Sequence, residues 1–227
     1  MRLRQLLKTC LLFTVVWTSS YGQAAANLEM AIHVYDYAGI HPGKLAEAEA
    51  FAARILEESG LGTKWSNCRL SPAANAPTRC AAAAGVIHLY IRLLPEKMAR
   101  KFTVPSSMLG MSLPTSEGTF PVDAYVFAER VGVLAQQDQI PLPPLLGAAI
   151  THEVGHLLLA NEAHTVSGIM RAQWGRRENN DALMGALRFS RGQSEQMRVN
   201  LNHRISGSNQ SNYIAHGERG IQPSHYR

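Results

Sequence analysis

The stretch that decides this chain's fold and chemistry is Thr151-His152-Glu153-Val154-Gly155-His156. It lies within an apolar run, Leu145 to Ala160, that Pro143 and Pro144 precede. An apolar run of this length, with prolines at its first turn, predicts a buried helix. Residues four apart lie on one helical face, about 6 Å apart along the axis. The two imidazoles of the stretch are therefore expected to point the same way.

The pattern His152-Glu153-x-x-His156 is the HExxH signature of a zinc helix. In that signature the two imidazoles bind one ion, and the Glu beside them activates a metal-bound water. The alternative is a buried helix that happens to carry two histidines. We disfavour it, because two imidazoles and a carboxylate are costly in a core without partners.

A catalytic zinc usually takes a third protein ligand, and His164 is the nearest downstream histidine. On a continuous helix it would lie about 12 Å beyond His156, out of reach of a shared ion. We therefore predict that the helix ends and the chain folds back between Ala160 and Glu162. Asn161 is the expected left-handed residue of that reversal. Glu162 remains an alternative third ligand.

These residues, followed by a turn, a third His and Gly168-Ile169-Met170, resemble the metzincin zinc endopeptidases, most closely the short matrixin-like bacterial members. The resemblance is strong from Leu145 to Met170. It implies a zinc ion held by three histidines, a glutamate that acts as general base and a turn methionine beneath the metal. In this chain the ligands would be His152, His156 and His164, the base Glu153 and the turn methionine Met170.

The chain departs from the usual metzincin pattern at three places. The family's Gly and third His, three and six residues after the second His, are here Leu159 and Glu162. The third His of this chain instead comes eight residues after the second. Some members carry a Tyr two residues after the Met, where this chain has Ala172. The longer loop must therefore close on the metal without its usual glycine.

β-Branched and aromatic runs predict five strands, and helical spacing predicts further helices on either side of the zinc helix. The strands are expected at 31–37, 63–66, 86–93, 108–113 and 124–127, and the helices at 44–59, 129–137 and 190–204. The first strand, helix and strand form a βαβ unit, hence a parallel pair. Pro105 and Pro114 favour an edge position for residues 108–113. Trp174 and Phe189 are expected in the core.

Taken with the resemblance, this order implies an α+β, zincin-like three-layer domain. Its expected parts are a mixed, mostly parallel five-stranded sheet with an antiparallel edge strand, the zinc helix, a Met-turn and a C-terminal helix. The predicted catalytic domain spans residues 25–205. Residues 206–227 are polar and without period, which predicts a disordered tail.

The first 24 residues have the features of a secretory signal peptide, with Arg2, Arg4 and Lys8 before a short apolar run. Its removal lowers the formal charge from +5 to +2, which gives no case for nucleic-acid binding. Export leaves Cys68 and Cys80 as a pair, for which we predict a disulfide. Zinc ligation by the two thiols is the alternative, and two cysteines at this spacing make a poor site on their own.

The sequence therefore predicts a secreted or periplasmic zinc metallopeptidase, a hydrolase that cleaves peptide bonds. Zinc-activated water is the expected nucleophile, with Glu153 as the general base. The alternative is an exported zinc-bearing binding protein with weak or lost peptidase activity. The expected partner is a protein or peptide substrate, and we expect a monomer with no membrane span after signal cleavage.

Overall fold

The computed structural model describes residues 28–68, 80, 86–113, 120–161 and 164–217, with side chains described to residue 207. The predicted signal peptide, residues 1–24, lies outside the described residues. The same holds for residues 69–79, Glu162 and the end of the chain, residues 218–227.

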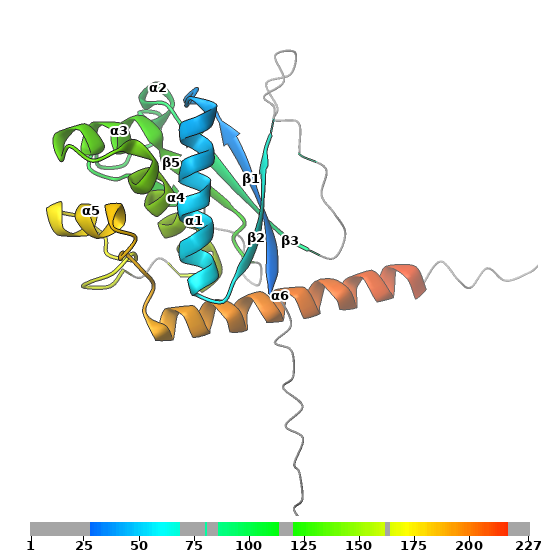
Figure 1. The fold of residues 1–227 in the computed structure, drawn as a ribbon. Helices are drawn as coiled ribbons and strands as arrows, with labels where there is room; N and C mark the ends of the chain where they lie inside the picture. The colour runs from blue at the N-terminus through cyan, green and yellow to red at the C-terminus, as the bar shows by residue number, and fades with distance from the viewer. Residues whose placement is uncertain (1–27, 69–79, 81–85, 114–119, 162–163, 218–227) are drawn as a thin grey trace, which may run out of the picture.

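Five strands form one mixed sheet in the order β2-β1-β3-β5-β4 (Figure 1). They are β1 (Glu29–Asp36), β2 (Gly62–Asn67), β3 (Ile87–Leu94), β4 (Gly110–Ser112) and β5 (Asp123–Phe127). β1 pairs in parallel with β2 and β3, and β3 pairs in parallel with β5. β4 runs antiparallel to β5 at the edge of the sheet. The predicted five-stranded, mostly parallel sheet with an antiparallel edge strand is confirmed.

Helices cover the sheet mainly on one face. They are α1 (Pro42–Glu58), α2 (Glu96–Ala99), α3 (Ala128–Gln137), α4 (Leu142–Leu159), α5 (Arg176–Leu183) and α6 (Arg191–Gly217). Alternate strand residues, such as Ile32 and Ile91, join the main core with side chains of α1 and α4. On the other face a smaller cluster packs Phe127 against α2. Among the described helices, α2 is the one that contributes a buried residue, Ala99, to this second cluster.

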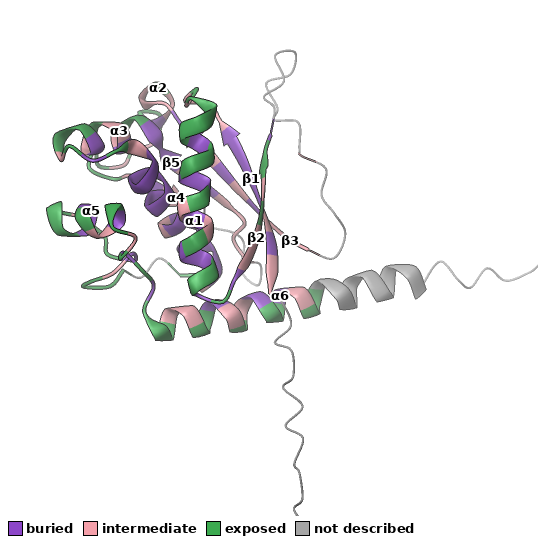
Figure 2. Ribbon diagram, viewed as in Figure 1, coloured by how far each residue is buried: buried purple, intermediate pink, exposed green. Residues whose placement is uncertain are grey.

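Helix α4 runs through the middle of the molecule and is buried nearly all round (Figure 2). Fifteen of its 18 residues are buried. Its glycine at position 147 allows α1 to approach closely, because a Cβ there would lie 2.5 Å from the Ala48 carbonyl oxygen and 2.7 Å from Phe51 Cβ. The backbones of α1 and α4 are thus in direct contact.

Helix α6 crosses the end of the molecule where α1 and α4 end (Figure 1). A capping box is present at its start, since the Ser190 and Gln193 side chains each accept a bond from the other residue's backbone N–H. Asn200 donates to the Leu158 carbonyl at 2.8 Å and the Arg204 guanidinium donates to the Leu157 carbonyl. These bonds satisfy carbonyls that the last turn of α4 leaves without helical partners.

The C-terminal end of α6 differs from the predicted one. The helix continues to Gly217, past the predicted end near residue 204 and into the segment expected to be a tail. The polar composition of this segment was therefore not sufficient to end the helix. None of the described helices combines the length and hydropathy needed to cross a membrane.

The predicted disulfide is present between Cys68 at the end of β2 and Cys80, with Cα atoms 5.6 Å apart. In the chain-entropy model, closing a loop of this length stabilises the folded state by about 3 kcal/mol. It links the residue that follows β2 to Cys80, which precedes β3 in the sequence.

The close packing at residue 147 generates a paired test. Gly147→Ala should lower the free energy of unfolding by about 1–3 kcal/mol, because the added methyl overlaps the α1 backbone. Gly132→Ala in α3 adds the same atom where nothing lies within 4 Å, and it should raise stability by about 0.5–1 kcal/mol. Urea unfolding of both variants measures the difference, and equal effects would contradict the contact.

Candidate metal centre

Helix α4 presents His152 and His156 on one face, as their spacing predicts. The two Nε2 atoms lie 3.1 Å apart, and the ring centroids are separated by 4.8 Å. Two nitrogens bound to one tetrahedral zinc at its usual bond length lie about 3.3 Å apart. The two imidazoles are therefore already placed at nearly the separation that a shared ion requires.

The chain reverses directly after α4, at a different residue from the one expected. Ala160, not Asn161, takes the left-handed conformation, with φ 54° and ψ 34°. Its N–H donates to the His156 carbonyl at 3.0 Å, which closes the last turn. A non-glycine residue in this region costs roughly 1 kcal/mol. Asn161 has another use: its carbonyl accepts a bond from His156 Nδ1 at 2.9 Å.

The reversal brings His164 back to the pair on α4. Its ring centroid lies 5.4 Å from that of His152 and 4.8 Å from that of His156. One potential ligand atom from each of the three histidines lies within 4.8 Å of the others. The structure thus brings together the three side chains that were predicted from the sequence to be metal ligands. Glu162, the alternative ligand, lies outside the described residues.

Hydrogen bonds to the backbone determine which ring nitrogens face the centre. His152 Nδ1 lies 2.6 Å from the Ile169 carbonyl oxygen, and His156 Nδ1 bonds the Asn161 carbonyl. A carbonyl can only accept, so both Nδ1 atoms carry the proton. Burial lowers the pKa of His152 to about 4, with a smaller lowering from His156 and His164. At neutral pH the His152 ring is therefore neutral.

These protonation states test whether a metal would fit. With both Nδ1 protons directed to carbonyls, the Nε2 lone pairs of His152 and His156 face one another at 3.1 Å. Such an arrangement is stabilised by a cation between them, and imidazole nitrogen is a preferred ligand of Zn²⁺. The carbonyl partners also orient the rings, as outer-shell groups of metal sites commonly do. The donor set fits zinc.

The Gly168-Ile169-Met170 segment forms a tight turn beneath this pair. Gly168 has φ 77°, and Arg171 N–H donates to its carbonyl at 3.2 Å. Met170 is fully buried, and its sulfur would lie 2.5 Å from a Cβ at position 155 of α4. Gly155, between the two helix histidines, therefore permits the methionine turn to pack directly on the helix. The same turn carries the Ile169 carbonyl that orients His152.

Glu153 lies beside the histidines and is only 4% exposed. Its carboxylate packs against β4 at Gly110, where an added Cβ would meet Glu153 Oε1 at 2.5 Å and the Tyr125 carbonyl oxygen at 2.7 Å. The space occupied by the carboxylate thus exists because residue 110 has no side chain. Sequence reasoning placed this segment at the sheet edge but had no signal for the contact, which joins residues 43 positions apart.

A cleft of about 1130 Å³ opens over the three histidines and Glu153. Its walls include all of β4, the segment before it, part of α3 and residues 171–174. Trp174, expected in the core, is only partly buried there, and its ring lies edge-on to His152 with centroids 5.8 Å apart. Phe189 is in the core, as predicted. Trp174 thus lines the cleft, which the sequence did not predict.

Comparisons with known proteins give a distant likeness of fold. No protein-family model matches the chain, and no curated protein sequence matches it. The fold is similar to the crystal structure of archaemetzincin from Methanopyrus kandleri, with a TM-score of 0.47 and 14% sequence identity over 79% of this chain and 99% of that one. So distant a likeness says nothing about activity, and the site itself has to carry any functional conclusion.

The convergence of the rings leads to a prediction about ligands. His164→Ala should weaken zinc binding by more than about 100-fold, since losing a ligand costs more than losing one of its outer-shell partners. Glu162→Ala should bind zinc as the unchanged chain does. Zinc competition with a chromophoric chelator measures both affinities. The reverse order of effects would make Glu162 the third ligand.

Proposed function

We propose that this protein is a zinc-dependent endopeptidase that acts outside the cytoplasm. The observation that carries the proposal is the meeting of three imidazoles and a buried carboxylate at the floor of one cleft. His152, His156 and His164 would hold the ion. Zinc bound there would lower the pKa of a water and polarise a carbonyl.

Glu153 is the proposed general base. It neighbours His152 on α4 and lines the same cleft, so a proton held at its carboxylate stays within the site. In the forward step it takes the proton of the attacking water, and it then returns that proton to the leaving amine. The Glu153 side chain is only 4% exposed, which limits its contact with bulk water.

The cleft favours an extended peptide as substrate. β4 is the edge strand of the sheet and all three of its residues line the cleft, together with apolar side chains such as Met108 and Leu109. An edge strand offers backbone donors and acceptors to an extended chain, and the flanking apolar side chains contact alternate residues of that chain. This arrangement supports cleavage within a chain that lies along β4.

Two features support export. The Cys68–Cys80 disulfide is of the kind that persists in oxidising compartments. The first residues of the sequence have the pattern of a signal peptide, although they lie outside the described residues.

Removing the base tests the proposal. Glu153→Gln should reduce kcat for an unstructured peptide by about 10²–10⁴-fold, the usual contribution of general base catalysis, while zinc content stays near one per chain. Glu57→Gln, an exposed change of the same kind on α1, is the matched control and should leave kcat unchanged. Peptide cleavage with and without chelator is the measurement. Binding without chelator-sensitive turnover in the unchanged chain would favour the alternative, a zinc-bearing binding protein.

The contact between β4 and Glu153 supplies a second test. Gly110→Ala should lower kcat by about 10²-fold, because the new methyl displaces the carboxylate and a shift of about 1 Å in a catalytic group can cost that much. Zinc content should not change, since the three atoms nearest to the added Cβ belong to Glu153 and Tyr125 and not to an imidazole. Gly192→Ala, where an added Cβ meets nothing within 4 Å, is the control. Full activity in Gly110→Ala would contradict the role of this contact.

A further inference from the structure

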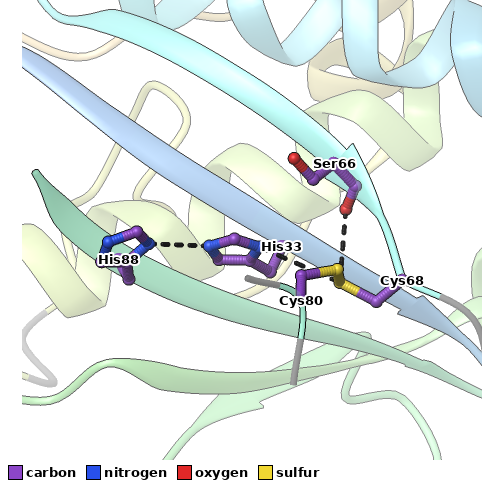
Figure 3. The surroundings of a disulfide bond; sticks show 5 residues. All are labelled: His33, Ser66, Cys68, Cys80 and His88. Carbon is purple, nitrogen blue, oxygen red and sulfur yellow. Dashed lines mark hydrogen bonds between the residues drawn. A yellow bond between two sulfur atoms is a disulfide. The ribbon is translucent and has the colours of Figure 1, made fainter. Parts of the chain in front are cut away.

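A second group of potential ligands lies on the face of the sheet opposite to α4. His33 of β1 points away from the core to which its neighbours Ile32 and Val34 belong, and it meets the disulfide (Figure 3). One ligand atom each from His33, Cys68 and Cys80 lies within 4.8 Å of the others. None of these residues has a part in the proposed peptidase site.

The spacing of these atoms is close to that of a metal site. His33 Nδ1 lies 3.9 Å from Cys68 Sγ. A nitrogen and a sulfur bound to one tetrahedral zinc lie about 3.6 Å apart, and two sulfurs about 3.8 Å apart. Separation of the two sulfurs on reduction would therefore bring all three atoms to ligand spacing with only a small movement of the side chains.

His33 is held in a fixed orientation toward the sulfurs. Its Nε2 lies 2.8 Å from Nδ1 of His88 on β3 (Figure 3). Its ring also stacks on that of Tyr90, with centroids 5.1 Å apart. When His33 donates from Nε2 to His88, its Nδ1 lone pair points at Cys68. Burial, with a smaller effect from the nearby His88, lowers the pKa of His33.

The disulfide alone does not account for this arrangement. A disulfide sulfur is a weak acceptor, so an imidazole that is only 2% exposed gains little by facing it. A histidine whose second nitrogen is bonded to a partner is, in contrast, the usual form of a metal ligand with its outer shell. Cys80 is partly exposed, which leaves a path to solvent for a reductant and an ion.

We propose that Cys68, Cys80 and His33 form a binding site for a thiophilic divalent ion such as Zn²⁺ when the disulfide is reduced. A dithiol reductant supplies two electrons and two protons and is itself oxidised to a disulfide, while the Cys68–Cys80 bond breaks to give two thiols. Binding of the ion then releases the two thiol protons and forms two metal–sulfur bonds. The disulfide and the metal are thus alternative links between Cys68 and Cys80. A solvent molecule would take the fourth coordination position of the ion.

Cobalt distinguishes this site from the three-histidine centre. Co²⁺ bound to thiolate shows a ligand-to-metal charge-transfer absorption in the near ultraviolet, which a site of imidazoles lacks. The full chain, reduced with a dithiol and freed of reductant without oxygen, should develop this absorption with one equivalent of Co²⁺. The oxidised chain should not develop it. His164→Ala should retain it, so the outcome is independent of the proposed peptidase site.

Matched variants of the reduced chain assign the ligands. Cys80→Ser should lose most of the absorption, and His33→Gln should bind Co²⁺ more than about 100-fold more weakly. His88→Gln, which removes only the outer partner, should weaken binding by about 10-fold. His203→Gln on α6, an exposed histidine, is the control. No near-ultraviolet absorption in the reduced unchanged chain, or equal Co²⁺ affinity in His33→Gln, would overturn the proposal.

Discussion

Direct backbone packing of α4 against its neighbours is the constraint on which the rest of the structure depends. At Gly147 the helix touches the backbone of α1, and at Gly155 it touches the sulfur of Met170 and the ring of Phe189. Neither contact leaves room for a side chain. A helix fixed at two points along its length cannot rotate, so the face that carries its two histidines is fixed toward the cleft. The depth of this packing also explains why nearly the whole helix is buried.

The two ends of the site are stabilised by different means. After α4, the left-handed Ala160 is an unfavourable conformation for a residue with a Cβ. The bond from His156 to the Asn161 carbonyl offsets that cost and also orients a ring of the site. Before α4, the edge strand lies against Glu153 because position 110 has no side chain. The strained residue Ala160 and the close contact at position 110 thus lie next to His156 and Glu153, the side chains whose positions the proposed reaction requires.

The two faces of the sheet carry different chemistry because side chains alternate along a strand. Ile32 and Leu89 face the helices and contribute to the apolar core, whereas His33 and His88 point to the opposite face and bond one another. The disulfide lies on that opposite face, next to His33. The peptidase proposal and the reduced-state metal site therefore rest on side chains separated by the sheet, and a change in one group need not alter the other.

The sequence by itself determined what depends on neighbours along the chain. The four-residue spacing of His152 and His156 put them on one helical face, β-branched and aromatic runs predicted the five strands, and two exported cysteines predicted one disulfide. The tertiary structure decided which residue of the reversal is left-handed, that Gly110 makes room for Glu153, and that His33 faces a disulfide. Local periodicity follows from the fixed rise and turn of helices and strands. Contacts between distant residues depend instead on strand order and loop closure, which single positions in a sequence do not encode.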